Sequence, residues 1–384
     1  MKTSRRSAVD PFIVMDVMEA ARTAEAEGRD IIHMEVGQPA TSAPARALEA
    51  ASRAMREGPM GYTVALGLPE LREGIADLYR RRHGLSLDPR RVVVTAGSSG
   101  AFTLAFLATL EAGERMALGD PSYPSYRNIL KALGVETLRL ETGEADRWQP
   151  TAAALTAPGT PDWGALLVAS PANPTGAMLD RARLADLAAA CRSREAWLIS
   201  DEIYHGLTYG APAVSALEVD DEAIVINSFS KYWSMTGWRI GWMVVPERMI
   251  RVIERLAQNM FICPPHVSQV AALAALGAEE ECEANRLRFE RNREILLDAL
   301  PRAGFDRLAP PDGAFYLYAD VAEFTDDSRN FCARMLSEAG VAATPGVDFD
   351  PVRGDNTVRF SFARSESEII EGARRLAAWA GAGM

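Results

Sequence analysis

Short apolar runs alternate with longer stretches of helical periodicity through the middle of the chain. Several runs are apolar nearly throughout, as expected for strands that are buried on both faces. They lie at 91–97, 114–120, 163–171, 196–204 and 223–231. The segments between them, such as 101–113 and 180–195, space their apolar residues as an α-helix does. The alternation predicts an α/β domain with a mostly parallel sheet covered by helices on both faces.

The pattern changes from about Glu279 onward. A long, highly charged helix is predicted over 280–304. Further strand or helix patterns follow at 313–321, 330–340 and 356–363. These elements do not continue the regular alternation, so the sequence predicts a separate α+β unit that begins near 280–290.

Composition narrows the class of protein. The chain has 384 residues, of which 48% are hydrophobic and 24% charged, and this length favours two subdomains over one simple core. No apolar run approaches the ~18 residues of a membrane span. A net charge of −11 without clusters of Lys or Arg argues against nucleic acid and anionic membranes as partners. The four scattered cysteines match no CxxC spacing, and no signal peptide is evident, so we expect reduced thiols in a cytoplasmic protein.

Candidate functional residues follow the predicted strands. Ligands of open α/β sheets bind beyond the carboxyl ends of the strands. Gly97, Ser98 and Ser99 follow the first strand and open a helix, where backbone N–H groups can bind a phosphate. Alone, such a stretch is more often only a tight turn, and neither a GxGxxG nor a Walker pattern accompanies it.

The other strand ends add further groups. The second strand leads to Tyr123 and Tyr126, the third to Asn173 in "SPANPTG", and the fourth to Asp201 and Tyr204. The last strand leads to Ser228, Ser230, Lys231 and, a little later, Arg239. Each residue alone fits a turn or a core position. Together they match the needs of pyridoxal phosphate: a lysine, an acid, a phenol or amide, a stacking ring, and donors with a cation for the phosphate.

With these motifs the chain resembles the class I/II aminotransferases, which are fold-type-I enzymes dependent on pyridoxal phosphate. The resemblance runs from "EVGQP" (35–39) to "VRFSFA" (358–363) and so covers nearly the whole chain. Its most specific pieces are "SPANPTG", "SDEIY" and "SFSKYWSMTGWRIGW", which stand in the family's order.

The resemblance implies a role for each matching residue. Lys231 matches the lysine that binds the cofactor covalently and later carries a proton, and Asp201 matches the acid that pairs with the ring nitrogen. Tyr204 and Asn173 match the partners of the ring oxygen, and Tyr123 matches the stacking aromatic. The remaining matches are the phosphate cup of Ser98, Ser99, Ser228, Ser230 and Arg239; the substrate α-carboxylate contacts Gly37 and Arg359; and Tyr62, which reaches the phosphate of the neighbouring subunit.

Physical chemistry supports these roles. A lysine attacks a carbonyl only when it is neutral, and burial or a nearby cation such as Arg239 lowers its pKa. A carboxylate at Asp201 keeps a pyridine nitrogen protonated, which makes the ring a better electron sink. The planar fork of Arg359 suits a carboxylate, although Arg359 considered alone is more simply a surface arginine on a strand.

The resemblance also implies the architecture and the assembly. We expect a large domain with a mostly parallel seven-stranded sheet flanked by helices, and a smaller α+β domain built from both chain ends. The expected division is an arm and part of the small domain at 1–45, the large domain at 46–285, and the rest of the small domain at 286–384. A homodimer with a shared active site is expected, with Tyr62 supplying the shared contact.

The expected activity is transfer of the amino group of an L-amino acid to a 2-oxo acid by a ping-pong mechanism. The alternative is a carbon–sulfur β-lyase, because both reactions need Lys231, Asp201 and Arg359. A regulator with an aminotransferase-like sensing domain would need a DNA-binding module for which this chain has no room. A dehydrogenase is disfavoured by the missing glycine fingerprint.

The substrate side chain is not fixed by the sequence. The apolar stretch 11–18 hints at an apolar or aromatic side chain, since in the family this segment often lies over the site, but an amphipathic helix that packs on the core explains it equally well. No residue can be nominated to bind a distal carboxylate, so the sequence neither supports nor excludes a dicarboxylic substrate.

Overall fold

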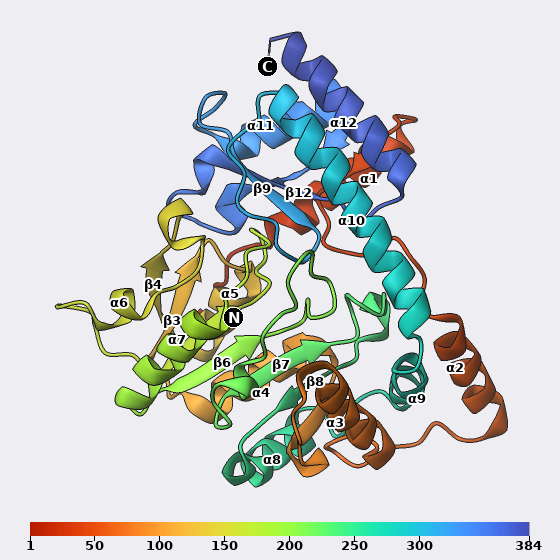
Figure 1. Cartoon of the computed structure of the whole chain (residues 1–384), viewed down its shortest axis with the longest axis vertical. Coiled ribbons are helices and arrows are strands. Elements are labelled where there is room, and N and C mark those ends of the chain that lie inside the picture. The colour runs from red at the N-terminus through yellow and green to blue at the C-terminus, as the bar shows by residue number, and fades with distance from the viewer. Residues whose placement is uncertain (384) are drawn as a thin grey trace.

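The computed structural model describes residues 1–383 and divides into a larger and a smaller part (Figure 1). A seven-stranded sheet forms the centre of the larger part. In sheet order its strands are β2 (Val92–Thr95), β8 (Gly241–Val244), β7 (Ile224–Ser228), β6 (Trp197–Asp201), β5 (Ala165–Ala169), β3 (Arg115–Asp120) and β4 (Glu136–Glu141). β8 runs antiparallel to both of its neighbours, and the other pairs are parallel. The predicted α/β fold class is confirmed.

Helices cover both faces of this sheet. They are α2 (Ala45–Glu57), α3 (Pro69–His83), α4 (Gly97–Thr109), α5 (Pro124–Leu133), α6 (Ala152–Thr156), α7 (Arg181–Ser193), α8 (Ile250–Met260) and α9 (His266–Ala275). On β7, Val225 packs into the core with α3, α7 and α9, whereas Ile224 and Ile226 pack with α4, α5 and α8. Burial on both faces explains why the strands read as apolar nearly throughout.

Two strands of this sheet were not predicted as separate elements. β4, "ETLRLE", is an edge strand with alternating polar and apolar residues, so its sequence lacks the continuous apolar run of the buried strands. β8 lies inside the stretch 227–245, where the polar residues around Lys231 obscured it. The helix after β2 also begins at Gly97 rather than 101, because the small residues 97–100 already form its first turn.

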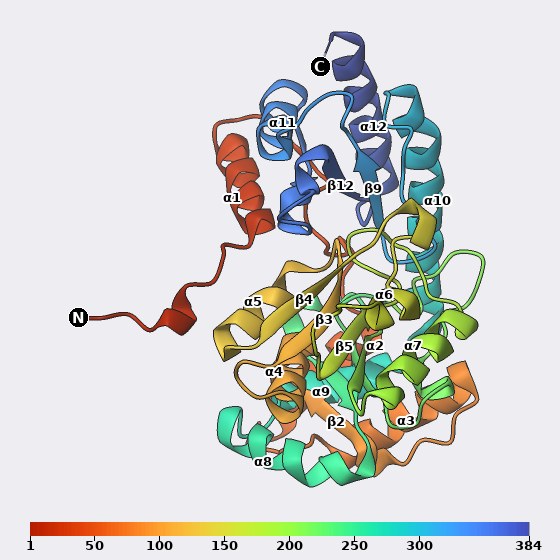
Figure 2. The same ribbon diagram turned by 90° about the vertical axis from the view of Figure 1, so that its left-hand side faces the viewer.

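The smaller part combines both ends of the chain. Its antiparallel sheet has the order β11 (Thr344–Pro345), β12 (Thr357–Ser361), β9 (Tyr316–Asp320). Its helices are α10 (Glu279–Arg302), α11 (Ser328–Arg334) and α12 (Glu366–Gly381). The early strand β1 (Ile32–His33) pairs with β10 (Val341–Ala342), and α1 (Ile13–Ala26) lies against the same part (Figure 2). None of the helices within 1–383 is long and apolar enough to cross a membrane.

The domain limits at 45 and 285 stay a prediction. The first lies just where α2 begins, after the segment that pairs with the smaller part. The second falls inside α10, which runs continuously from one part to the other (Figure 1). A helix that crosses a domain junction keeps its periodicity through the junction, so the sequence pattern cannot mark the crossing point.

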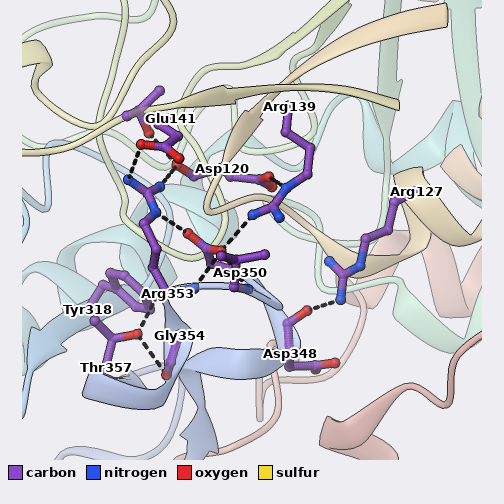
Figure 3. A network of polar contacts seen from close by, with 12 residues as sticks. Asp120, Arg127, Arg139, Glu141, Tyr318, Asp348, Asp350, Arg353, Gly354 and Thr357 are labelled. Carbon is purple, nitrogen blue, oxygen red and sulfur yellow. Dashed lines mark hydrogen bonds and ion pairs between the residues drawn. The ribbon is translucent and has the colours of Figure 1, made fainter. Parts of the chain in front are cut away.

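Charged side chains join the two parts beside β3 and β4 (Figure 3). Arg139 of β4 contacts Asp120 at the end of β3 and donates to Asp350 of the smaller part over 2.8 Å. Arg353 donates to the other Asp350 oxygen over 2.8 Å and to the Asp120 carbonyl over 2.7 Å. Asp120 and Asp350 are both buried, so these bonds compensate for the loss of hydration and fix the two parts relative to each other.

Candidate active site

A cavity of about 640 Å³ opens at the carboxyl ends of the strands, between the two parts of the chain. Most of the predicted site residues line it. These are Gly37, Ser98, Ser99, Tyr123, Asn173, Asp201, Tyr204, Ser230, Lys231, Arg239 and Arg359. The structure therefore brings together residues separated by more than three hundred positions in the sequence.

The start of α4 forms one end of the cavity. Ala96 provides no side-chain cap, so the first N–H groups of the helix are left for another acceptor. Arg239 reaches this helix start, and a Cβ at Gly97 would lie 2.4 Å from its Nη2 atom. Gly97 is therefore required for the close approach of the guanidinium. The helix N–H groups, Ser98, Ser99 and Arg239 together form an electropositive, donor-rich pocket suited to a phosphate.

Two predicted residues lie away from the cavity wall. Ser228 is buried, and its Oγ donates to Ser230 Oγ over 2.7 Å and contacts the carbonyl of Ile240. Ser228 thus orients the Ser230 hydroxyl through a hydrogen bond without lining the cavity itself. Tyr62 is 83% exposed and is not among the residues that line the cavity.

Asp201 is buried at the end of β6. The backbone N–H of Ile203 donates to its Oδ1 over 3.1 Å, and the Tyr126 hydroxyl donates to Oδ2. Burial raises the pKa of Asp201 to about 6, against the opposing effects of these two hydrogen bonds and of Lys231. No role was assigned to Tyr126 from the sequence, although it stands in the same "DPSYPSY" motif as Tyr123.

Lys231 projects into the cavity from the loop after β7. Its Nζ donates to the carbonyl of Gly37 over 2.5 Å. Burial, followed by the charges of Arg359 and Arg239, lowers its pKa to about 8, while Asp201 acts in the opposite direction. An amine with this pKa loses its proton readily near neutral pH, as a nucleophile or a base must.

Arg359 of β12 is 3% exposed, so the interpretation of Arg359 as a surface arginine is wrong. Its Nη1 donates to Asn173 Oδ1 over 2.8 Å, and its Nη2 donates to the carbonyl of Glu35 and, over 3.2 Å, to Thr344. The guanidinium lies 4.3 Å from the centre of the Tyr316 ring. These contacts hold the planar group rigidly at the cavity wall.

Tyr316 was missed by the sequence analysis. It comes from β9 in the smaller part, and its hydroxyl lies 2.7 Å from that of Tyr204. A Cβ on Gly37 would come within 1.9 Å of the Tyr316 oxygen, so glycine is needed at position 37. The only sequence signal for Tyr316 is its place in an apolar strand, which is shared by many core tyrosines.

A chain of charged side chains begins next to Arg359, at the residue whose carbonyl accepts its hydrogen bond. Glu35, whose carbonyl accepts from Arg359, is buried, and its carboxylate lies 2.8 Å from His33 Nδ1. The other ring nitrogen of His33 lies 3.0 Å from Glu25 of α1. The Glu35 contact is the main cause that raises the pKa of His33 to about 9, so the imidazole is protonated at neutral pH. This ion pair stabilises the segment that leads into Gly37.

The residues present fit pyridoxal phosphate. The pocket at Gly97 suits its phosphate, Tyr123 offers an aromatic face, and the buried Asp201 offers a carboxylate. Asn173 and Tyr204 offer an amide and a phenol, and Lys231 is the amine of the cavity. No other common cofactor uses this whole set of groups.

Comparison with known proteins agrees with this chemistry. The family model for aminotransferase class I and II matches residues 29–376. The chain is 48% identical over 382 residues to a valine–pyruvate aminotransferase of Mycobacterium tuberculosis, covering 98% of each chain. It is 33% identical over 388 residues to an aspartate aminotransferase of Geobacillus stearothermophilus, again covering 98% of each. A crystal structure of a putative aminotransferase from Silicibacter pomeroyi matches with a TM-score of 0.94, 57% identity and full coverage of both chains.

The chain belongs to the class I and II aminotransferase family. It is a pyridoxal-phosphate-dependent transaminase that moves an amino group from an amino acid to a 2-oxo acid by a ping-pong mechanism. The resemblance drawn from the sequence is confirmed. The relatives named above are transaminases and give no support to the β-lyase alternative.

Proposed function

We propose that this transaminase takes L-amino acids with apolar side chains, valine among them, as donors, and a small 2-oxo acid such as pyruvate as acceptor. The observation that carries this proposal is the composition of the cavity wall. Phe12, Val14 and Met15 of the N-terminal segment line it beside Val36 and Ile203. The name of the 48% identical relative, valine–pyruvate aminotransferase, supports the same choice.

The distribution of positive charge supports apolar donors as well. The positively charged residues that line the cavity are Lys231, Arg239 and Arg359. Arg239 serves the phosphate end, Lys231 serves the reacting carbon, and Arg359 serves the α-carboxylate. Within the described part of this chain, the cavity wall therefore keeps no further cation for the second carboxylate of a dicarboxylic donor. Burying an unpaired carboxylate there would be costly.

Each cavity residue takes one role in this proposal. The start of α4, Ser230 and Arg239 bind the phosphate of the cofactor, Tyr123 stacks on its ring, and Asn173 and Tyr204 bind its ring oxygen. Asp201 holds a proton on the ring nitrogen. Gly37 and Arg359 bind the α-carboxylate of the substrate. The places of these residues on the cavity wall support the assignments.

The chemistry divides between the cofactor and the chain. Bound pyridoxal phosphate supplies an electron sink for the electron pair left at the substrate Cα. Lys231 removes the Cα proton at its Nζ and returns it elsewhere during transfer, which its lowered pKa favours. Arg359 orients the substrate: among residues 1–383, Nη1 has Asn173 as its one hydrogen-bond partner and so retains an N–H for the carboxylate. Val14, buried at the wall, helps to exclude water.

A donor screen tests the proposed specificity. Purified holoenzyme is mixed with single amino acids, and the change in cofactor absorbance gives the rate of the first half-reaction. We expect valine and other apolar donors to react at least about tenfold faster than aspartate, because an unpaired second carboxylate is disfavoured in this cavity. Equal or faster reaction of aspartate would contradict the proposal.

Substitution of Arg359 tests how the donor is oriented. Arg359→Lys keeps the charge but loses the planar fork, so we expect kcat/KM to fall by about one to two orders of magnitude for all amino acid donors alike. Cofactor absorbance should not change. A primary amine without a carboxylate, if it reacts, should lose much less. Equal losses for both kinds of donor would show that Arg359 is structural.

We propose further that the enzyme is a homodimer in which Tyr62 reaches the neighbouring active site. Apolar side chains that a partner could cover are exposed on two adjoining segments, with Met55 59%, Val64 57% and Ile262 52% exposed. The segments meet where Thr63 N–H donates to Cys263 Sγ over 3.4 Å.

Two measurements test the proposed dimer. Sedimentation should give twice the chain mass of 41.7 kDa. Tyr62→Phe should weaken cofactor binding while the protein remains a dimer. A monomer that is fully active would refute this arrangement.

The cysteines support a cytoplasmic location. All four are free thiols, and Cys191, Cys282 and Cys332 are buried. Such thiols are typical of reducing compartments. Fractionation of producing cells, with a cytoplasmic marker enzyme as the reference, would test this assignment.

A further inference from the structure

Helix α1 begins without a cap of its own. Its N-cap residue, Phe12, has no side-chain acceptor, although the first N–H groups of a helix need one. Asp348, from the short 3₁₀ turn Gly346–Asp348 that follows β11, supplies both acceptors. Its Oδ1 accepts from Ile13 N–H over 3.1 Å and its Oδ2 accepts from Val14 N–H over 3.2 Å. Both oxygens of one carboxylate are thus bonded to the first turn of α1.

The Asp348 carboxylate is completely buried. Burial raises its pKa, and the bonds from α1 together with the charges of Arg359 and Arg127 oppose that effect. Arg127 also donates to the Asp348 carbonyl (Figure 3). A buried carboxylate is costly unless donors and positive potential compensate, and here the start of α1 supplies both. The cap and the helix start therefore depend on each other.

The capped turn is also part of the active-site wall. Phe12, Val14 and Met15 line the cavity, and the rings of Phe12 and Tyr123 pack at an angle of 78° with 5.7 Å between their centres. Just before this turn, the Asp10 carboxylate meets Lys131 Nζ of α5 at 3.3 Å. Figure 2 shows α1 above α5 of the larger part, and α1 contacts β10 and β11 of the smaller part. The first turn of α1 therefore bridges the two parts at the cavity.

The residue after Asp348 touches two predicted site elements. The Phe349 carbonyl accepts from Ser122 N–H over 3.1 Å, one residue before Tyr123. The Phe349 ring lies 4.7 Å from the Arg359 guanidinium. The loop that caps α1 is thus packed against the groups proposed to hold the cofactor ring and the substrate carboxylate, so displacement of α1 and of this loop must be coupled.

We propose that Asp348 is a positioning residue that fixes the first turn of α1 against the cavity and thereby sets the preference for donors with apolar side chains. The inference rests on the proposed function. Without the cap, two N–H groups of α1 lose their acceptor in a buried position, so the first turn frays and the apolar wall is lost. Donors whose side chains need that wall lose affinity, whereas alanine, with a single methyl group, depends on it least.

The sharpest test is Asp348→Asn, which keeps the shape of the side chain. The amide carbonyl still accepts one N–H, but the NH₂ group faces the other, so the bidentate cap is broken. We expect the ratio of kcat/KM for valine to that for alanine to fall by about tenfold, the size of effect that follows the loss of a charge-assisted hydrogen bond. Cofactor absorbance should stay the same. The ratio is independent of the amount of folded enzyme.

Asp350→Asn is the matched control. Asp350 is also buried and lies two positions further along, but it bonds to Arg139 and Arg353 and not to α1. This variant should keep the valine-to-alanine ratio of the wild type, whatever its stability. Hydrogen exchange of the peptide that contains residues 13–18 should accelerate in Asp348→Asn and stay slow in Asp350→Asn.

The outcomes separate the two proposals. An unchanged ratio in Asp348→Asn overturns the role of Asp348, and so does an equal fall of the ratio in Asp350→Asn. Wild-type enzyme that does not prefer apolar donors refutes the proposed function, while the exchange data still show whether Asp348 caps α1. If Asp348→Asn does not fold, Asp348→Glu keeps the charge and moves the carboxylate by one methylene, and the same direction of change is expected.

Discussion

Lys231→Ala is expected to abolish transamination while pyridoxal phosphate stays bound. The variant loses the amine that bonds to the cofactor and carries the Cα proton, so we expect turnover to fall by at least about a thousandfold. The phosphate pocket at α4, Tyr123 and Asp201 all remain, since none depends on Lys231 for its place. Cofactor content after gel filtration and steady-state rates with valine measure the two effects separately.

Because the chain has few lysines, the site of covalent attachment can be assigned without ambiguity. The chain has two other lysines, Lys2 and Lys131. Borohydride reduction of wild-type holoenzyme, followed by peptide mapping, should place the cofactor on Lys231. Lys131 is exposed and pairs with Asp10, so Lys131→Ala should retain the covalent cofactor and serves as the control. A label on Lys2 or Lys131, or turnover by Lys231→Ala, would contradict the assignment.

Many of the site residues that the sequence revealed lie at the end of a strand or a few residues beyond it. Asp201, Asn173 and Lys231 stand at the ends of β6, β5 and β7, and parallel strands bring their carboxyl ends to one edge. The strand pattern of the sequence was therefore enough to predict that these three residues lie close together. The resemblance then supplied the residues from the chain ends, Gly37 and Arg359, which no strand-end argument could have reached.

The residues that were missed lie on elements whose position depends on packing. Tyr316 enters the cavity from β9 of the smaller part, and Asp348 reaches α1 across 335 positions of sequence. Neither residue stands in a motif, because a buried tyrosine and a loop aspartate are common in any chain. Tyr126 stands close to Tyr123 in the same motif, but its hydrogen bond to Asp201 depends on how α5, which carries Tyr126, is placed relative to β6. Contacts made through tertiary packing have no local signature.

Asp201→Asn is expected to slow the chemical step far more than it weakens cofactor binding. The neutral amide keeps the shape of the side chain: its oxygen can still accept from Ile203 N–H, and its NH₂ group can donate to the Tyr126 hydroxyl, which reverses the direction of that bond. It cannot, however, stabilise a proton on the ring nitrogen, and the bound cofactor becomes a poorer electron sink. A loss of ~3 kcal/mol of that stabilisation slows the step by about a hundredfold. Single-turnover rates with valine, together with cofactor titration, measure both quantities.

The neighbouring carboxylate provides the control for that result. Glu202 is completely buried but faces away from the cavity, where its Oε1 accepts from Ala216 N–H over 2.7 Å and from two serine hydroxyls. Burial raises its pKa to about 8, so Glu202 is largely protonated at neutral pH, and Glu202→Gln replaces one neutral group by another. We therefore expect Glu202→Gln to keep the single-turnover rate within about threefold, since no charge near the ring changes. A rate loss in Glu202→Gln as large as that in Asp201→Asn would show that the effect comes from disturbance of the 201–205 turn and not from the charge of Asp201.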